Sequence, residues 1–257
     1  YKMTFSGNIT GNLGVTFTSS GHYANKYEQT LSGDNTFTGN LAVGGGVTFV
    51  VGSSKALGNG KFYQNSGNLN SWGRAAERTS ANYFRSITFN GGQPLDLSSS
   101  PAVLNNTAVT LAVSSRTLTL GGLGEAEIGS SLTKAGAGTL VLAGDSTYSG
   151  DTAVTEGVLQ IDGKNESRVY AVDAEATLKF GESAVLPEKT VLSIAEGGTV
   201  FLYGYVIHNI KSLIIGDIEQ EPYGTYGAIG SGATHEMACF RGPGKVRFNT
   251  GFSVKLR

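Results

Sequence analysis

The sequence has one cysteine, Cys239, among its 257 residues. A lone cysteine excludes a disulfide framework and a cysteine-based metal cluster. The apolar run 237–240 predicts a buried strand in which Cys239 acts as a small hydrophobic side chain rather than as a nucleophile. No metal site and no cofactor are predicted, so stability is expected to come from packing alone.

Charged residues are also scarce, at 15% of the chain against a typical ~25%, and the formal net charge is −1. The absence of any basic block argues against a nucleic-acid partner. No run of about 18 apolar residues occurs, so no transmembrane segment is predicted. Residues 1–5 already read as a strand, and we expect the export signal and the anchor to lie outside this sequence.

Glycine, in contrast, is abundant, with 38 residues against 5 prolines. Short runs of alternating apolar and polar residues, such as 117–120, 139–142 and 177–180, are closed by Gly, Asn or Asp. This pattern is typical of strands separated by turns. Only the segment 72–84 has a composition that predicts a helical turn, so the predicted class is all-β.

An internal repeat distinguishes between the all-β architectures. Residues 31–43, LSGDNTFTGNLAV, align with residues 142–154, LAGDSTYSGDTAV, and the match continues from 46–49 to 157–160. A shorter copy of the repeat lies near the start of the chain, with Gly7 at the position of Gly33, 26 residues earlier. This spacing is the length of one coil of a β-solenoid, whose repeats span roughly 20–30 residues.

We therefore predict a right-handed parallel β-helix (solenoid), with a β-sandwich as the alternative. The predicted organisation is a single domain over 1–257, in which four features stand out: repeats near 4–15, 31–49 and 128–160, an insertion at about 62–85, and a capping region at about 223–257. Alternate side chains of each strand face inward, which places Leu142 and Val154 in the core. Asp145 is expected at a corner, where Gly, Asn and Asp suit the turn.

The segment 128–160 is long and specific enough to suggest a family. It combines the lysine and glycines of LTKAGAGTLVLAGD with an aromatic residue before Ser-Gly and a Leu-Gln ending. It resembles the autotransporter-associated β-strand repeat, and the segment 223–246 resembles the end of such passengers. The resemblance implies export, a bacterial secreted or outer-membrane-surface location, and association with an outer-membrane export or anchoring component.

Two aspartates are the candidate catalytic residues. Asp145 and Asp151 flank a short turn and faintly resemble the paired loops of aspartic proteases, in which two carboxylates activate water. Both lack the glycine that such loops carry in third place. Both also occupy repeat turn positions, where Asp is favoured for its local hydrogen bonds. The structural explanation is preferred.

Aromatic residues of the expected insertion are the candidate binding residues. Insertions in solenoids project from one face and frequently bind ligands. Trp72, Tyr63 and Tyr83 are expected to stack on sugar rings, with Arg74 as a polar partner. The competing and preferred explanation is that these side chains pack the segment onto the coil.

The sequence thus predicts a secreted or surface-displayed β-helical passenger with a structural, adhesive or host-glycan-binding role. Host glycoproteins or glycans are the expected partners. The alternative is a surface hydrolase carried on a β-helix: an aspartic-type protease, or a glycan-degrading enzyme acting on mucin-like polymers. A convergence of two carboxylates in a cleft would favour the enzyme.

Overall fold

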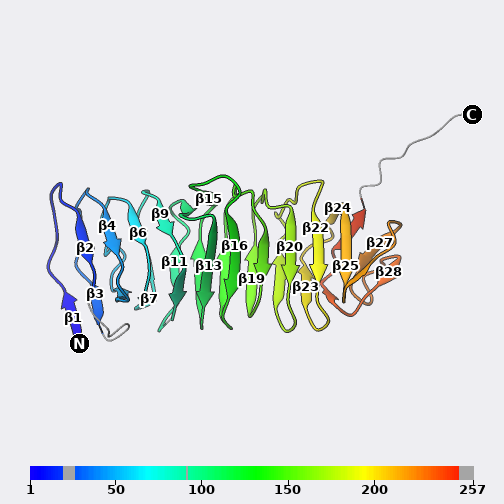
Figure 1. The fold of residues 1–257 in the computed structure, drawn as a ribbon, viewed down its shortest axis with the longest axis horizontal. Helices are drawn as coiled ribbons and strands as arrows, with labels where there is room; N and C mark the ends of the chain where they lie inside the picture. Colours follow the sequence, from blue (N-terminus) through cyan, green and yellow to red (C-terminus); the bar gives the residue numbers. More distant parts are fainter. Residues whose placement is uncertain (20–26, 91, 249–257) are drawn as a thin grey trace, which may run out of the picture.

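The computed structural model describes residues 1–19, 27–90 and 92–248. Within them it contains thirty strands and no helix, which confirms the all-β class. The described part accordingly has no helix able to span a membrane. The strands wind into one elongated solenoid, which runs from β1 at the left of Figure 1 to β27 and β28 at the right.

Three sheets run along the solenoid and form its faces. The first face has twelve strands, in the order β1 (Lys2–Phe5), β3 (Glu28–Leu31), β5 (Thr48–Val51), β7 (Asn68–Ser71), β10 (Ile87–Phe89), β13 (Ala108–Val113), β16 (Ser131–Ala135), β18 (Thr152–Val154), β20 (Val169–Val172), β22 (Val191–Ile194), β25 (Ser212–Ile215) and β26 (Ile218–Glu219).

The other two faces are shorter. The second face has eight strands: β8 (Arg74–Ala75), β11 (Leu95–Leu97), β14 (Thr117–Leu120), β17 (Thr139–Leu142), β19 (Val158–Ile161), β21 (Thr177–Phe180), β23 (Thr199–Leu202) and β29 (Phe240–Arg241). The third face has six: β2 (Val15–Phe17), β4 (Leu41–Val43), β6 (Phe62–Gln64), β9 (Asn82–Phe84), β12 (Ala102–Leu104) and β15 (Leu123–Glu125).

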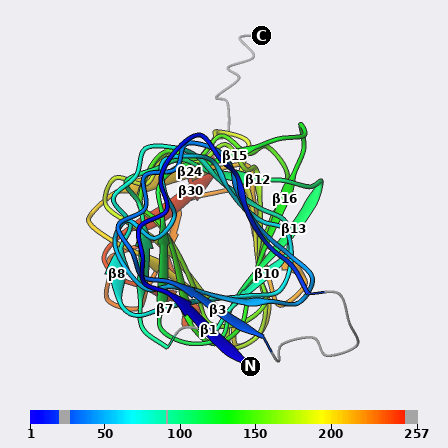
Figure 2. The same ribbon diagram turned by 90° about the vertical axis from the view of Figure 1, so that its left-hand side faces the viewer.

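Pairing along these faces joins strands one coil apart and is parallel, as in β14–β17 and β17–β19, except for the antiparallel pair β25–β26 at the end of the first face. Parallel pairing excludes the β-sandwich, which is built from antiparallel sheets. Seen from the N-terminal end, the chain turns clockwise as it recedes (Figure 2), so the solenoid is right-handed, as predicted.

The core is a set of stacked apolar ladders. Leu118, Leu140, Leu159 and Leu178 occupy equivalent positions in β14, β17, β19 and β21, and each is fully buried. The residues beside them in each strand are half-buried and face outward. Leu142 and Val154 are inward-facing, as the repeat predicts, because the side-chain period of two in a strand alternates between the faces of a sheet.

The segment 62–85 does not project as an insertion. Its backbone supplies β6, β7, β8 and β9, which pair with strands of the adjoining coils on all three faces. The helical turn expected in 72–84 is also absent. Instead Arg78 is buried and donates hydrogen bonds to the carbonyls of Leu57, Gly60 and Ser80, which holds the chain against the preceding coil.

The C-terminal end is closed by a different arrangement. A four-stranded sheet contains β24 (Ile207–Ile210), β30 (Lys245–Phe248), β27 (Thr225–Gly227) and β28 (His235–Glu236), with β27 antiparallel to β30. Cys239 lies half-buried in the turn before β29 rather than in a strand. The single-domain extent and the boundaries of the capping region stay predictions, and residues 249–257 lie outside the described part.

This terminal sheet contains a buried histidine. His208 in β24 is 4% exposed, its ring lies 5.6 Å from that of Phe180, and its Nε2 has no hydrogen-bond partner among the described residues. Burial lowers the pKa of His208 below its ordinary value of 6.5. The folded protein therefore resists binding a proton that the unfolded chain accepts, so stability is lost as the pH falls below about 6.5.

We expect the free energy of unfolding to fall by up to about 1.4 kcal/mol for each pH unit across that window. His208→Leu should reduce this slope, which denaturant unfolding at pH 7.0 and 5.5 would measure, with Ile207→Leu in the same strand as a non-titrating control. An unchanged slope in His208→Leu would contradict a buried neutral histidine.

Candidate functional site

The third face ends at β15, and the next three coils have no strand on this side before β24 of the C-terminal sheet; we call this stretch the third-face gap. Residues 146–150, 164–168 and 184–189 cover it, held by two isolated bridges, Ser146–Asn165 and Lys164–Val185. The repeat's aromatic residue, Tyr148, points inward here and is fully buried. The backbone over these residues is therefore irregular, as it also is over residues 32–40 and 52–61, where the second face has no strand.

Side-chain hydrogen bonds replace the missing ladder inside the gap. The hydroxyls of Tyr148 and Thr152 lie 2.6 Å apart, and Thr152 donates to Ser167 Oγ at 2.9 Å. Asn165 donates to Tyr148 Oη at 3.2 Å and accepts from the Ser167 backbone N–H. All four side chains are buried, so the network joins two coils without a strand pair.

The lysine of the repeat, Lys134, is bonded to backbone carbonyls of two coils, which the sequence did not predict. Lys134 is fully buried, and its Nζ donates to the carbonyls of Ala135, Gly136 and Glu156 at 2.6–2.9 Å. Burial lowers the pKa of Lys134 to about 8, while the Glu156 carboxylate acts in the opposite direction. The ammonium group joins one corner of a coil to the equivalent corner of the next.

The candidate catalytic aspartates lie at opposite ends of the stretch 146–150. Asp145 is exposed at a corner, as predicted, and its Oδ1 accepts a hydrogen bond from the Lys164 backbone N–H at 2.8 Å. Asp151 is also exposed, and no hydrogen bond joins the two carboxylates in the described part of the chain. This contact joins Asp145 to the next coil, 19 residues further along the chain, and is not a local turn bond of the kind that favours aspartate at corners. A catalytic role for the pair stays a prediction.

Two of the candidate binding residues lie together. Tyr63 and Tyr83 occupy equivalent outward positions of β6 and β9, and their rings stack at 4.6 Å with an angle of 15° between planes. The Lys61 ammonium lies 5.4 Å from the centre of the Tyr83 ring. Their neighbours in the same outward row, Ala42 and Val103, have short side chains. The stack therefore stands out from the third face.

The other two candidate binding residues lie elsewhere on the coil. Trp72 follows β7 of the first face and is 49% exposed. Arg74 belongs to β8 of the second face. Neither residue shares the face of the tyrosine pair, so the structure splits the four predicted residues between three faces.

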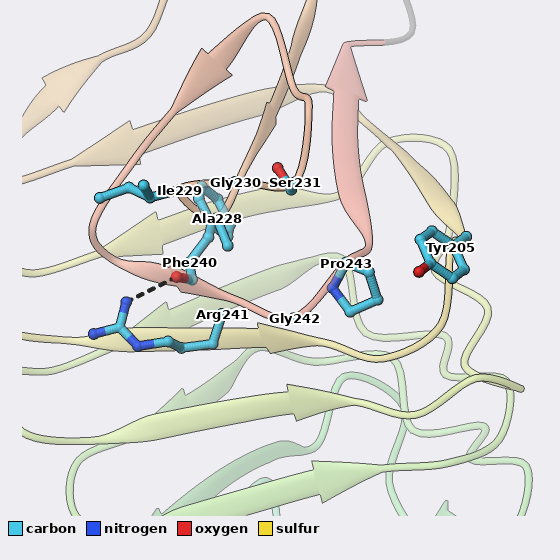
Figure 3. A pocket seen from close by; sticks show the side chains of 9 residues that line it. All are labelled: Tyr205, Ala228, Ile229, Gly230, Ser231, Phe240, Arg241, Gly242 and Pro243. Atoms are coloured by element: carbon cyan, nitrogen blue, oxygen red, sulfur yellow. Dashed lines mark hydrogen bonds between the residues drawn. The ribbon is translucent and has the colours of Figure 1, made fainter.

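A hollow of about 400 Å³ lies beside the C-terminal sheet, between its loops and β29 of the second face (Figure 3). It is lined by Tyr205, Ala228, Ile229, Gly230, Ser231, Phe240, Arg241, Gly242 and Pro243. The Arg241 guanidinium donates to the carbonyls of Ala238 and Phe240. Because its one charged group is already bonded to the backbone, this hollow offers little to recognise a polar ligand.

A second hollow, also of about 400 Å³, lies on the outer surface of the third-face gap. Sequence reasoning missed it, since its residues come from three coils and share no motif. Within the residues that the structure describes, no group of three or more His, Cys, Asp or Glu side chains is placed to hold a metal ion.

Comparison with known proteins supports the repeat. The passenger-associated-transport-repeat model matches residues 28–50 and 132–161. An extracellular serine protease of Serratia marcescens is 56% identical over 54 residues, which are 21% of this chain and 5% of that protein. A second extracellular serine protease of that organism is 59% identical over 39 residues, 15% of this chain and 4% of the relative.

These alignments cover about a twentieth of each relative, so they bear on the repeat and not on the protease activity of the relatives' names. No solved structure gives a significant match. The two matched segments coincide with β3 to β5 and with β16 to β19, the coils in which the sequence repeat was found. The chain therefore carries two copies of the autotransporter passenger repeat within a parallel β-solenoid.

Proposed function

We propose that this chain is a structural and adhesive segment of an exported bacterial passenger, located outside the cell or on its surface. The observation that carries the proposal is the continuous parallel ladder of the first face, from β1 to β25, over a core of stacked apolar side chains. Such a solenoid is rigid along its length and presents its outer faces at fixed spacing.

The tyrosine stack is the part of the surface best suited to adhesion. Tyr63 and Tyr83 are half-buried and lie on strands rather than on loops. Aromatic rings fixed on a scaffold bind with little loss of conformational freedom. The outer ring faces, next to Ala42 and Val103, are able to take the apolar side of a sugar. A glycan chain on a host glycoprotein is the ligand class that we propose.

The double variant Tyr63→Ala/Tyr83→Ala should weaken retention on immobilised mucin-type glycoprotein by about tenfold or more, because aromatic anchors dominate such contacts. Biolayer interferometry with the purified chain would measure it. Phe201→Ala, which removes an outward aromatic side chain from β23 on the second face, is the control, and the melting temperature of each variant checks folding. Retention that is unaffected by the double variant would remove this face from the proposal.

The rival function is hydrolysis. The same preparations can be incubated with mucin and with casein at acid and neutral pH. Cleavage that disappears in Asp145→Asn/Asp151→Asn would replace the adhesive role by an enzymatic one, since asparagine also suits these turn positions. The absence of cleavage would leave adhesion as the function for these substrates.

A further inference from the structure

The hollow on the third-face gap combines charged and apolar side chains. Seven residues line it: Ser149, Lys164, Glu166, Arg168, Val185, Leu186 and Pro187. The hollow forms because three successive coils cross this face without forming a sheet. Their outward side chains therefore do not lie in the even rows that a regular sheet produces. A volume of about 400 Å³ lies at the lower end of the range of small-ligand sites.

The backbone that carries the charges is fixed from inside. Asn165 and Ser167 point inward into the buried hydrogen-bond network, while Lys164, Glu166 and Arg168 alternate with them and are exposed. This backbone keeps its position before a ligand arrives, so the side chains start from fixed Cα positions, which lowers the entropy cost of binding.

One cation in the hollow is available to a ligand. The Lys164 ammonium pairs with the Glu166 carboxylate at 3.1 Å. The Arg168 guanidinium makes no ion pair or hydrogen bond with any residue that the structure describes. On the opposite side lie Leu186, Pro187 and the 55% exposed Val185, which give an apolar wall.

A rigid ridge borders the hollow. The loop after β15 is held by the Glu125 carboxylate, which accepts hydrogen bonds from the backbone N–H groups of Gly129, Ser130 and Ser149 and from Ser149 Oγ. Burial acts to raise the pKa of Glu125, but these hydrogen bonds outweigh it and lower the pKa overall. Ser149 is thereby fixed at the rim of the hollow.

We propose that this hollow binds a carboxylated sugar, such as a uronic or sialic acid residue of an anionic glycan. The Arg168 guanidinium pairs with the sugar carboxylate through two parallel hydrogen bonds, the geometry in which arginine recognises carboxylates best. The C–H face of the ring lies against Val185 and Pro187, and Glu166 accepts hydrogen bonds from ring hydroxyls. The proposal rests on the glycan adhesion proposed above and specifies a second contact for it.

The test uses the whole purified chain and two defined probes, the methyl glycosides of N-acetylneuraminic acid and of glucuronic acid. Titration calorimetry or ligand-observed NMR should detect binding that Arg168→Gln weakens at least tenfold. Lys179→Gln removes a cation from β21 on the second face and should leave binding unchanged. Val185→Ser should weaken binding several-fold if the apolar wall contacts the ring.

Three results would overturn the inference: no binding of either sugar acid, equal binding by Arg168→Gln, or binding of sodium acetate as tight as that of the sugar acids. The last would reduce the hollow to a simple carboxylate site. The two proposals can also be separated on mucin-type glycoprotein. If retention depends on Tyr63 and Tyr83 but is unchanged in Arg168→Gln, this inference is wrong and the proposed function still stands.

Discussion

Leu140→Asp is expected to lower the free energy of unfolding by more than about 4 kcal/mol, the range reached when an unpaired charge enters a core. Leu140 is fully buried between Leu118 and Leu159 of the adjoining coils. A carboxylate placed there finds only apolar neighbours. Denaturant unfolding followed by circular dichroism would measure the loss, and Leu140→Ala, expected to cost about 2–5 kcal/mol, keeps the test usable if the aspartate variant fails to fold.

The matched control is Val141→Asp, one residue further along β17. Val141 faces outward between Thr119 and Gln160, so its substitution should change stability by less than about 1 kcal/mol. Equal losses at the two positions would contradict the inward and outward alternation on which the coil depends.

Gly122→Ala is expected to destabilise the protein by about 3 kcal/mol, the upper end of ordinary overpacking. A Cβ atom added at Gly122 would lie 2.0 Å from the carbonyl oxygen of Asp145, one coil away. Neighbouring strands are about 4.8 Å apart, so a backbone corner stacked on a backbone corner leaves no room for a side chain. Thermal unfolding of the purified variant would show the effect as a lower midpoint.

Gly124→Ala provides the comparison within the same coil. An added Cβ there meets the Thr147 hydroxyl at 3.6 Å and the Ala102 carbonyl oxygen at 3.8 Å, which are ordinary contacts. Glycine weakens a strand interior, so this variant should be neutral or slightly stabilised. A loss at Gly124 as large as that at Gly122 would show that the effect comes from backbone flexibility and not from the steric contact.

The strands of the repeat were predictable because short-range pattern and long-range packing agree there. In β17 and β19 every inward residue is apolar, so the alternation of apolar and polar residues in the sequence matches the alternation of buried and outward side chains in the strands. The corner at Asp145 followed from the turn preference of aspartate. The comparison of 31–43 with 142–154 then indicated that such strands stack.

The segment 62–85 was misread because four of its buried residues are polar: Gln64, Ser71, Arg78 and Asn82. Gln64 and Asn82 are fully buried, and each breaks the apolar alternation of its strand. Asn82 donates to Ser100 Oγ at 2.7 Å, and Gln64 donates to the Ser66 carbonyl at 2.8 Å. Ser100 lies on the following coil, so the sequence pattern alone could not show that Asn82 has a partner inside the solenoid.

The candidate site was only partly predictable for the same reason. Tyr63 and Tyr83 were named as binding candidates, but their stacking follows from strand pairing across 20 residues of chain. Arg168 was not named, because an isolated arginine among polar residues gives no signal in one sequence. The hollow beside it results from the absence of a strand pair, which a single sequence does not show.

The pairing of each coil with only its immediate neighbours affects how the chain evolves in length. Removing or duplicating one whole coil of roughly 20–30 residues lets the strands on either side pair again in the same register. The molecule then shortens or lengthens by a single strand spacing, about 4.8 Å. Recombination between repeats such as 28–50 and 132–161 therefore produces solenoids of different length, each of which still folds.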